Sequence, residues 1–318
     1  MRIFHGVKSA KGLHAPSAAI GNFDGVHLGH QAVIRRLLRD GGAGGDKIII
    51  TFDPHPRTVL RKGNAPLRIM PLEHRLRIFE KEGIDAVVII KFTKRFSLLS
   101  PEDFIKQTLV PLGCRKVFVG CDFHFGKGRM GDAAAVEEAG KKYGISIFSV
   151  SPVKKNGTIV SSTRVRELIA AGELEKASKL LARPVSVLGT VVKGDERGRE
   201  LGFPTANIDP HHEITPPPGV YAVRACIKGK YRGGVANIGF RPTFYGTRRN
   251  EREEPLIEVF IFDFKENIYG TNIEVQFLKM LRREKKFGSK EALVRQIRKD
   301  IARAKTIVRS GSPRPLTR

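Results

Sequence analysis

Hydrophobic and polar positions alternate in blocks along the first half of the chain. Short apolar runs predict strands at residues 16–23, 46–52, 85–92, 115–120 and 145–150. Segments with a helical spacing of apolar residues lie between them, at 30–40, 71–83, 100–113 and 131–144. The first helix carries its apolar face on Val33, Ile34, Leu37 and Leu38. Apolar strands that alternate with helices predict an α/β domain with a covered parallel sheet, whose ligands bind at the carboxyl ends of the strands.

The pattern changes near Pro184, after two short predicted helices at 161–172 and 173–182. Segments rich in β-branched and aromatic residues then predict strands at 185–194, 219–229, 231–239, 255–264 and 272–281. We expect no helix between these strands until residues 289–308. The pattern therefore predicts an antiparallel barrel or sandwich with a closing C-terminal helix. We expect domains at 1–183 and 184–308, followed by a disordered tail at 309–318.

Composition changes this picture little, but charge raises the question of partners. Hydrophobic residues make up 41% and charged residues 28%, as in globular proteins. Neither a signal peptide nor an apolar run of membrane-spanning length is visible, so we expect a cytoplasmic protein without a membrane partner. The 3 cysteines lack C-x-x-C spacing, which argues against a disulfide framework and a zinc site.

A net charge of +25 attracts phosphate-rich partners. The basic residues are scattered, and the chain has no Trp and only 5 Tyr to stack on bases. We therefore expect anionic small molecules rather than nucleic acid as partners, and a monomer or weak homo-oligomer. A basic nucleic-acid-binding protein remains the alternative from another functional class.

The segment "GNFDGVHLGH" lies where the first predicted strand passes into the first helix. Gly21, Gly25 and Gly29 would let the backbone approach a phosphate, and the N–H groups of a helix N-terminus favour an anion. His27 and His30 are three residues apart, so both can face one bound group and stabilise charge during phosphoryl or nucleotidyl transfer. A zinc pair or two solvated histidines are the alternatives.

Three further segments in the first half suit phosphate chemistry. "TFDPHP" ends the second predicted strand and brings His55 to the carboxyl edge of the sheet. "GCDFHFGKGRMGD" follows a later strand with a loop rich in glycine and basic residues. "SSTRVR" opens a helix with hydroxyl groups and Arg166, although hydroxyls at that position are also typical of an ordinary N-cap.

In the second half, "GDERGRELGFPTANI" combines glycines with hard oxygen ligands. Gly194 and Gly198 predict a mobile loop that can approach phosphates, and Pro204 sets the turn before Thr205 and Asn207. A hydroxyl and an amide carbonyl suit Mg²⁺ that carries nucleotide phosphates. A tight turn between two strands is the structural alternative.

The strand segment "LIEVFIFDF" carries a carboxylate in an apolar setting. Strand alternation places Ile257, Val259 and Ile261 on one face, so that Glu258 shares the other face with Phe260. A carboxylate among phenylalanines is a candidate general base. A glutamate at the rim of an edge strand is the alternative.

The four motifs of the first half, in this order, resemble the FAD synthetase (FMN adenylyltransferase) module of bacterial bifunctional riboflavin kinase/FAD synthetases. The resemblance implies a Rossmann-like nucleotidyltransferase domain in which His27 and His30 hold ATP phosphates and stabilise charge at the α-phosphate. It implies that Thr163 and Arg166 hold the phosphates from the other side. The remaining residues implied to bind ATP or phosphate are Gly21, Phe23, Asp24, Gly25, Gly29, Asp122 and Ser162.

The second half resembles the riboflavin kinase module of the same family in "RGRELGFPTANI", "PGVYAV", "GGVANIGFRPTF", "IEVFIFDF" and the closing helix. The resemblance implies a six-stranded barrel. It also implies that Thr205 and Asn207 bind Mg²⁺ and ATP, together with Gly194 and Gly198, and that Glu258 deprotonates riboflavin. The partners would then be riboflavin, FMN and ATP, converted to FMN and then to FAD. A chain with only one surviving activity is a further alternative.

Overall fold

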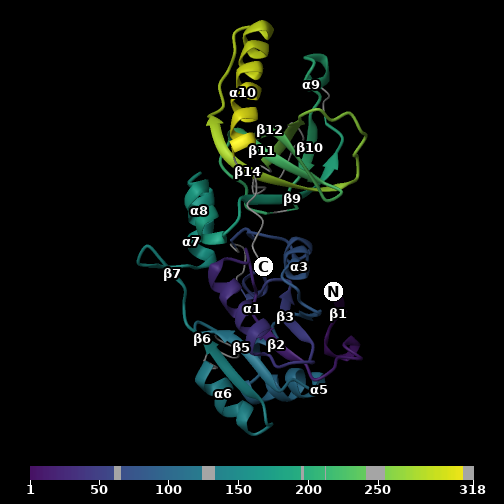
Figure 1. Ribbon diagram of the computed structural model, residues 1–318, viewed down its shortest axis with the longest axis vertical. Helices are drawn as coiled ribbons and strands as arrows, with labels where there is room; N and C mark the ends of the chain where they lie inside the picture. The colour runs from purple at the N-terminus through teal and green to yellow at the C-terminus, as the bar shows by residue number, and fades with distance from the viewer. Residues whose placement is uncertain (61–65, 124–132, 195–196, 212, 241–254, 311–318) are drawn as a thin grey trace. The chain divides into compact units, whose positions relative to one another are not determined.

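The computed structural model describes residues 1–60, 66–123, 133–194, 197–211, 213–240 and 255–310 (Figure 1). The chain forms two compact units. The first contains Met1–Arg68 and Leu72–Ser162, and the second contains Ile69–Pro71 and Thr163–Arg318. The predicted domain boundary after residue 183 stays a prediction. Helices α7 (Ser162–Ala170) and α8 (Leu174–Leu181) fall almost entirely within the second unit, where α8 packs on barrel strands.

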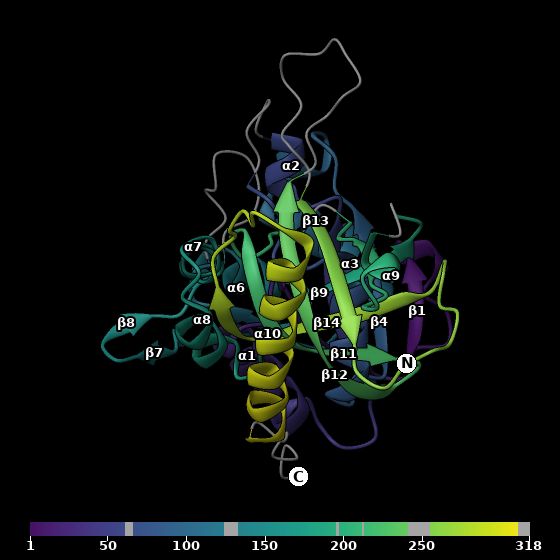
Figure 2. The same ribbon diagram turned by 90° about the horizontal axis from the view of Figure 1, so that it is seen from above.

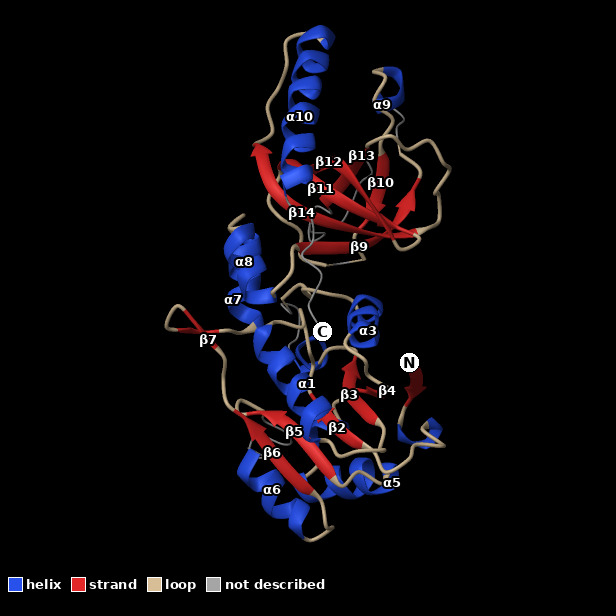
Figure 3. Ribbon diagram, viewed as in Figure 1, coloured by secondary structure: helices blue, strands red, loops and turns tan. Residues whose placement is uncertain are grey.

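A six-stranded parallel sheet forms the centre of the first unit (Figure 3). Its strands are β1 (Arg2–His5), β2 (Ser17–Ile20), β3 (Lys47–Asp53), β4 (Ala86–Lys91), β5 (Lys116–Gly120) and β6 (Ser146–Val150). The order is β1-β4-β3-β2-β5-β6, with all neighbours parallel, which confirms the predicted sheet. The central strands are almost fully buried, whereas β1 is a largely exposed edge strand that the apolar pattern did not predict.

Helices cover both faces of this sheet. The helical segments described in this unit are η1 (Val7–Ser9), α1 (Leu28–Asp40), α2 (Pro56–Leu60), α3 (Leu72–Lys81), η2 (Phe96–Leu98), α4 (Pro101–Phe104), π-helical η3 (Ile105–Leu109), α5 (Val110–Leu112) and α6 (Ala133–Lys141). Helix α1 packs on β2 and β5 with Val33, Ile34 and Leu37 buried, while Leu38 is half-buried. On the other face, Phe104 and Leu109 join the core beneath the strands.

The polypeptide leaves the sheet through a short hairpin, β7 (Lys154–Lys155) and β8 (Thr158–Ile159). A closed barrel then forms the second unit, from β9 (Val185–Val192), β10 (Ala206–Asp209), β11 (Gly219–Ile227), β12 (Lys230–Phe240), β13 (Pro255–Ile261) and β14 (Asn272–Arg282). The order is β10-β13-β12-β11-β14-β9, and all neighbours are antiparallel. The predicted antiparallel barrel is therefore confirmed, and β10 closes it.

Besides α7 and α8, the described part of the second unit contains helices that follow the start of the barrel. The predicted closing helix is α10 (Lys290–Ser310), which packs on β11, β12 and β14 (Figure 2). Its Ala304 joins an apolar cluster with Phe262 and Leu281, and Arg282 donates to the buried Asp300 at 2.8 Å. The expectation of uninterrupted strands was wrong, because the short helix α9 (Arg197–Glu200) lies between β9 and β10.

Helix α10 extends two residues, 309 and 310, into the predicted tail, and residues 311–318 lie outside the described part of the chain. Among the residues that the structure describes, no helix is both long enough and apolar enough to cross a membrane.

Candidate active sites

The first candidate site lies at the carboxyl edge of the parallel sheet. Strand β2 ends at Ile20, beside β3 on one side and β5 on the other. The loop from Gly21 to His27 therefore leaves the sheet between the segments that follow Asp53 and Gly120. The predicted phosphate-binding segments after β2, β3 and β5 therefore begin at the same end of the sheet, where ligands of parallel sheets bind.

The backbone of this loop is strained at two residues that are not glycine. Phe23 has a φ of 50° and Val26 a φ of 38°, and Gly25 between them has a φ of 84°. Such values suit glycine and are rare for a β-branched residue, at a cost of roughly 1–3 kcal/mol each. The surrounding structure must hold this conformation, and strain of this kind is typical of functional loops.

His27 and His30 form a stacked pair at the start of α1. His27 is the N-cap of the helix, and its Nδ1 accepts a hydrogen bond from the backbone N–H of His30 at 3.4 Å. The ring centroids are 3.7 Å apart with an interplanar angle of 16°. Because Nδ1 of His27 accepts, a neutral ring carries its proton on Nε2, the nitrogen that can donate to a phosphate oxygen.

Packing holds this histidine pair in place. The ring of Phe23 lies edge-on to His30, with centroids 5.3 Å apart, and is only 1% exposed. A phosphate contact from Phe23 is therefore left to its backbone N–H. A Cβ atom on Gly29 would lie 3.1 Å from the ring of His27, so a larger residue would displace that ring. A Cβ on Gly21 would likewise lie 3.2 Å from the ring of Phe23.

The other predicted residues of this site have distinct environments. Asp24 is 3% exposed, and its backbone carbonyl accepts a hydrogen bond from the Ser162 hydroxyl at 2.9 Å. Asp122 is exposed just after β5, and the residues 124–132 of its loop lie outside the described part of the chain. Thr163 and Arg166 follow on α7 within the second unit, and their action on the same ATP stays a prediction.

The second candidate site is a polar row across three strands of the barrel. Glu258 on β13 pairs in register with Asn207 on β10 and with Asn237 on β12. Residues opposite each other on neighbouring strands point to the same face, about 4.5–5.5 Å apart at Cβ. Their neighbours along the strands, such as Ile208 and Ile257, are buried in the barrel. The polar row therefore lies on the outer face, with a carboxylate between two amides.

Two glycines let the chain close around this row. A Cβ atom on Gly194 would lie 1.9 Å from Nδ2 of Asn207, and a Cβ on Gly198 would lie 3.1 Å from Oγ1 of Thr205. The sequence analysis assigned these glycines to phosphate approach. The structure shows a further requirement, because both pass directly against the predicted metal-binding side chains.

The donor set of Thr205 and Asn207 fits a hard divalent cation. Asn207 is 5% exposed, and its Oδ1 is buried without a hydrogen-bond partner among the residues that the structure describes. Thr205 is half-buried and contributes a hydroxyl oxygen. Leaving a buried carbonyl oxygen unpaired costs free energy, which a bound ion or ligand would recover.

Sequence reasoning missed Asn237. Besides Phe260 on its own strand, Glu258 has an asparagine in register on each neighbouring strand. Phe260 packs against Phe203 and Phe262, with ring centroids 5.7 and 6.0 Å away. The alternation of polar and apolar residues in "VANIG" could have singled out Asn237, but the pairing register could not be read from it.

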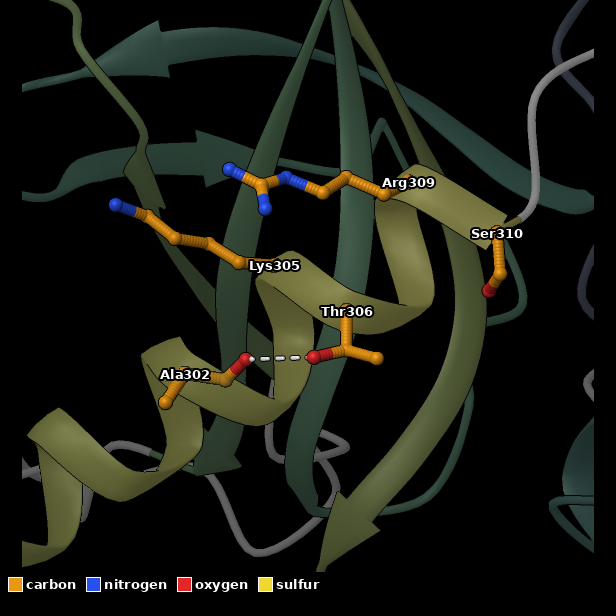
Figure 4. A pocket seen from close by; sticks show the side chains of 5 residues that line it. All are labelled: Ala302, Lys305, Thr306, Arg309 and Ser310. Carbon is orange, nitrogen blue, oxygen red and sulfur yellow. Dashed lines mark hydrogen bonds between the residues drawn. The ribbon is translucent and has the colours of Figure 1, made fainter.

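A separate hollow of about 520 Å³ lies along α10 (Figure 4). It is lined by Ala302, Lys305, Thr306, Arg309 and Ser310, all from this one helix. The Thr306 hydroxyl donates to the Ala302 carbonyl at 3.3 Å. None of the predicted site residues lines this hollow, so it has no part in either candidate site.

A parallel sheet with paired histidines at the carboxyl ends of its strands, followed by a barrel with a buried amide beside a carboxylate, is the arrangement expected of a two-part phosphate-transferring enzyme. Residues 10–164 match the FAD synthetase family and residues 181–308 match the riboflavin kinase family. The chain belongs to the family of bifunctional riboflavin kinase/FMN adenylyltransferases. The resemblance stated from the motifs is confirmed.

Relatives cover nearly the whole chain. A bifunctional riboflavin kinase/FMN adenylyltransferase of Haemophilus influenzae is 38% identical, over 98% of this chain and 100% of its own length. One of Buchnera aphidicola is 37% identical, over 95% and 97%. A crystal structure described as a macrolide-efflux protein of Streptococcus pneumoniae has a TM-score of 0.80 at 29% identity, covering 95% of this chain and 98% of that one. This likeness supports the two-unit architecture.

Proposed function

We propose that the two reactions of the family are divided between the two units. The second unit transfers the γ-phosphate of ATP to riboflavin, which gives FMN. The first unit transfers the adenylyl group of a second ATP to FMN, which gives FAD and pyrophosphate. The match of each unit to its own family supports this division.

In the kinase reaction, Glu258 acts as the general base. It accepts the proton of the riboflavin 5′-hydroxyl while that oxygen attacks the γ-phosphorus and the bond to the β-phosphate oxygen breaks. The observation that carries this assignment is the register of β13, which sets the carboxylate beside the buried amide of Asn207. Asn237, on the other side, keeps the carboxylate in a polar environment.

Enzymes of this kind need a divalent metal ion, and we propose Mg²⁺ held by Thr205 and Asn207. When bound, the ion neutralises charge on the ATP phosphates. The two side chains offer only neutral oxygen ligands, so the remaining ligands would be phosphate oxygens and water, as Mg²⁺ prefers.

In the adenylyl transfer, His27 and His30 donate hydrogen bonds to the phosphates as negative charge develops at the α-phosphate. A phosphate oxygen of FMN attacks the α-phosphorus, and the bond to the β-phosphate oxygen breaks as pyrophosphate leaves. The N-terminus of α1 adds backbone N–H groups and a favourable dipole. Arg166 and Thr163 hold the phosphates from the other side in this proposal, and Asp122 contacts the reacting phosphates.

The purified chain tests the proposal directly. It is incubated with riboflavin, ATP and Mg²⁺, and riboflavin, FMN and FAD are separated by chromatography over time, with a control lacking ATP. We expect FMN first and FAD after it. FMN without FAD, even when FMN is supplied, would overturn the assignment of the first unit. No conversion at all would overturn both.

A further inference from the structure

The loop between β2 and α1 is held by a buried arginine that the catalytic proposal does not use. Arg75 on α3 is only 2% exposed. Its Nη1 donates to the backbone carbonyl of Asn22 at 2.5 Å and to the Thr51 hydroxyl at 3.0 Å. The guanidinium thus joins the first residue after Gly21 to the end of β3, at the edge of the sheet where the phosphates are proposed to bind.

Core packing alone does not explain a charged group at this position. Burial lowers the pKa of Arg75 from its ordinary value, and the nearby carboxylates of Asp24 and Asp53 oppose that shift. Its Nε has no hydrogen-bond partner among the residues that the structure describes. A buried cation with an unpaired donor costs free energy, and an apolar side chain of similar length would avoid that cost.

Two further side chains hold alternate carbonyl groups of the same loop. The Ser162 hydroxyl donates to the carbonyl of Asp24 at 2.9 Å, and Nε2 of Gln31 donates to the carbonyl of Val26 at 2.9 Å. Because Arg75 donates to the carbonyl of Asn22, the carbonyls of residues 22, 24 and 26 each accept a hydrogen bond from a different helix.

The planarity of the peptide bond gives this arrangement a consequence for the N–H groups. In a trans peptide, the C=O of one residue and the N–H of the next point in opposite directions. Donors that hold the carbonyls of Asn22, Asp24 and Val26 therefore direct the N–H groups of the following residues, 23, 25 and 27, away from those donors. Backbone N–H groups that a loop holds in fixed directions can form an anion-binding concavity.

We propose that Arg75, Gln31 and Ser162 form a carbonyl clamp that orients the loop for the ATP triphosphate, with Arg75 as its central member. This inference rests on the proposed adenylyl transfer by the first unit. Arg75 does not touch the substrate and is a positioning residue. It keeps Phe23 and Val26 in their unfavourable backbone conformations before ATP binds.

The test uses full-length Arg75→Met, which keeps an apolar chain but removes the charge and donors, and Arg75→Lys, which keeps the charge and one donor group. Arg77→Met is the matched control, because Arg77 lies on the same helix, is 42% exposed and pairs with Glu73. FMN adenylylation is measured over a range of ATP concentrations. Riboflavin phosphorylation by the same preparation reports on the second unit.

For Arg75→Met we expect kcat/KM for ATP in adenylylation to fall on the order of 100-fold, with a clear rise in KM, because the phosphate-binding groups are misplaced. Arg75→Lys should recover part of the loss, and Arg77→Met should match the wild type. Riboflavin phosphorylation should be unchanged in all variants. A purely structural role would instead reduce the folded fraction and leave KM unchanged, which would overturn the proposal.

If Arg75→Met does not fold, Gln31→Leu keeps the inference testable, because Gln31 is only half-buried. Loss of the donor to Val26 should lower the same kcat/KM about tenfold, the equivalent of one hydrogen bond. An unchanged value would overturn the clamp. The wild type shows which proposal fails. A wild-type chain that makes no FAD contradicts the proposed adenylyl transfer itself. An active wild type with unaffected variants contradicts only the clamp.

Discussion

The two units prepare for phosphate chemistry in different ways. In the first, the proposed site is built on a loop at the end of a strand, where strained backbone at Phe23 and Val26 and a helix N-terminus would provide the binding groups. In the second, the site is built from side chains that meet in register on neighbouring strands. A loop site depends on what holds its peptide groups, whereas a strand site depends on register and on the residues that let the chain pass close by.

A variant that loses one activity and keeps the other tests most directly whether the two units act separately. Glu258→Gln should show the largest such effect. The amide keeps the size of the side chain but cannot accept the hydroxyl proton. We expect riboflavin phosphorylation to fall about 10²–10⁴-fold, the usual contribution of a general base. FMN adenylylation should stay at the wild-type rate, measured with supplied FMN.

Glu266→Gln is the matched control for that substitution, because Glu266 is exposed and lies 3.9 Å from Lys228 in the same unit. It should leave both activities unchanged. Loss of both activities in folded Glu258→Gln would show that the two reactions share a site.

His30→Ala should have the reverse effect. Removing one charge-stabilising donor should lower FMN adenylylation about 10²–10³-fold and leave riboflavin phosphorylation intact. His14→Ala serves as the control. His14 precedes β2, at the amino ends of the strands, and its Nδ1 lies 3.0 Å from the carbonyl oxygen of Gly44. Equal losses in both histidine variants would contradict a specific role for His30.

Gly194→Ala tests whether the strand site depends on close approach. The added Cβ would lie 1.9 Å from Nδ2 of Asn207, so the amide or the loop must move. We expect riboflavin phosphorylation to fall about 10–100-fold, with more Mg²⁺ needed for half-maximal rate, because small displacements at a reacting centre are costly.

Gly288→Ala is the control for the glycine, since a Cβ there meets nothing within 4 Å. Adenylylation should be normal in both glycine variants. A Gly194→Ala enzyme with wild-type kinase activity and metal dependence would show that Asn207 does not need its present position.

Much of the fold could be predicted because burial leaves a direct mark on sequence. Strands β3 and β4 are nearly continuous runs of Ile and Val with almost no exposure, and they were predicted within a residue or two. Strand β1 is an exposed edge with mixed residues, and β10 is only four residues long and follows Pro204. Neither has an apolar pattern, because pairing with a neighbour rather than burial of both faces defines them.

The two candidate sites also differ in how far the sequence could predict them. The histidines and glycines of the first site are contiguous in the chain, so their spacing alone indicated a common ligand. Arg75 is 53 residues from Asn22, and Asn237 is 21 residues from Glu258. Such partners are brought together by the packing of α3 and by the register of the barrel, which one-dimensional spacing does not encode.

The smallest expected effect is a difference between the two units in how their stability falls at alkaline pH. Burial raises the pKa of the Cys114 thiol in the first unit from 9.0 to about 12, and that of the Tyr221 hydroxyl in the second from 10.0 to about 12. Both groups are neutral when protonated, so the unfolded chain releases these protons at lower pH than the folded chain. Stability is complete below the unfolded pKa and is lost as pH rises towards 12.

The first unit should therefore begin to lose stability above pH 9 and the second above pH 10, each by on the order of 3 kcal/mol at pH 12. Calorimetric unfolding from pH 8 to 12 measures this. Cys114→Ala should be less stable at pH 8 because of the cavity, but its first unit should then lose less stability with pH, whereas the exposed Cys121→Ala should follow the wild type. An undiminished alkaline loss in Cys114→Ala would show that other groups drive the transition, and would remove this distinction between the units.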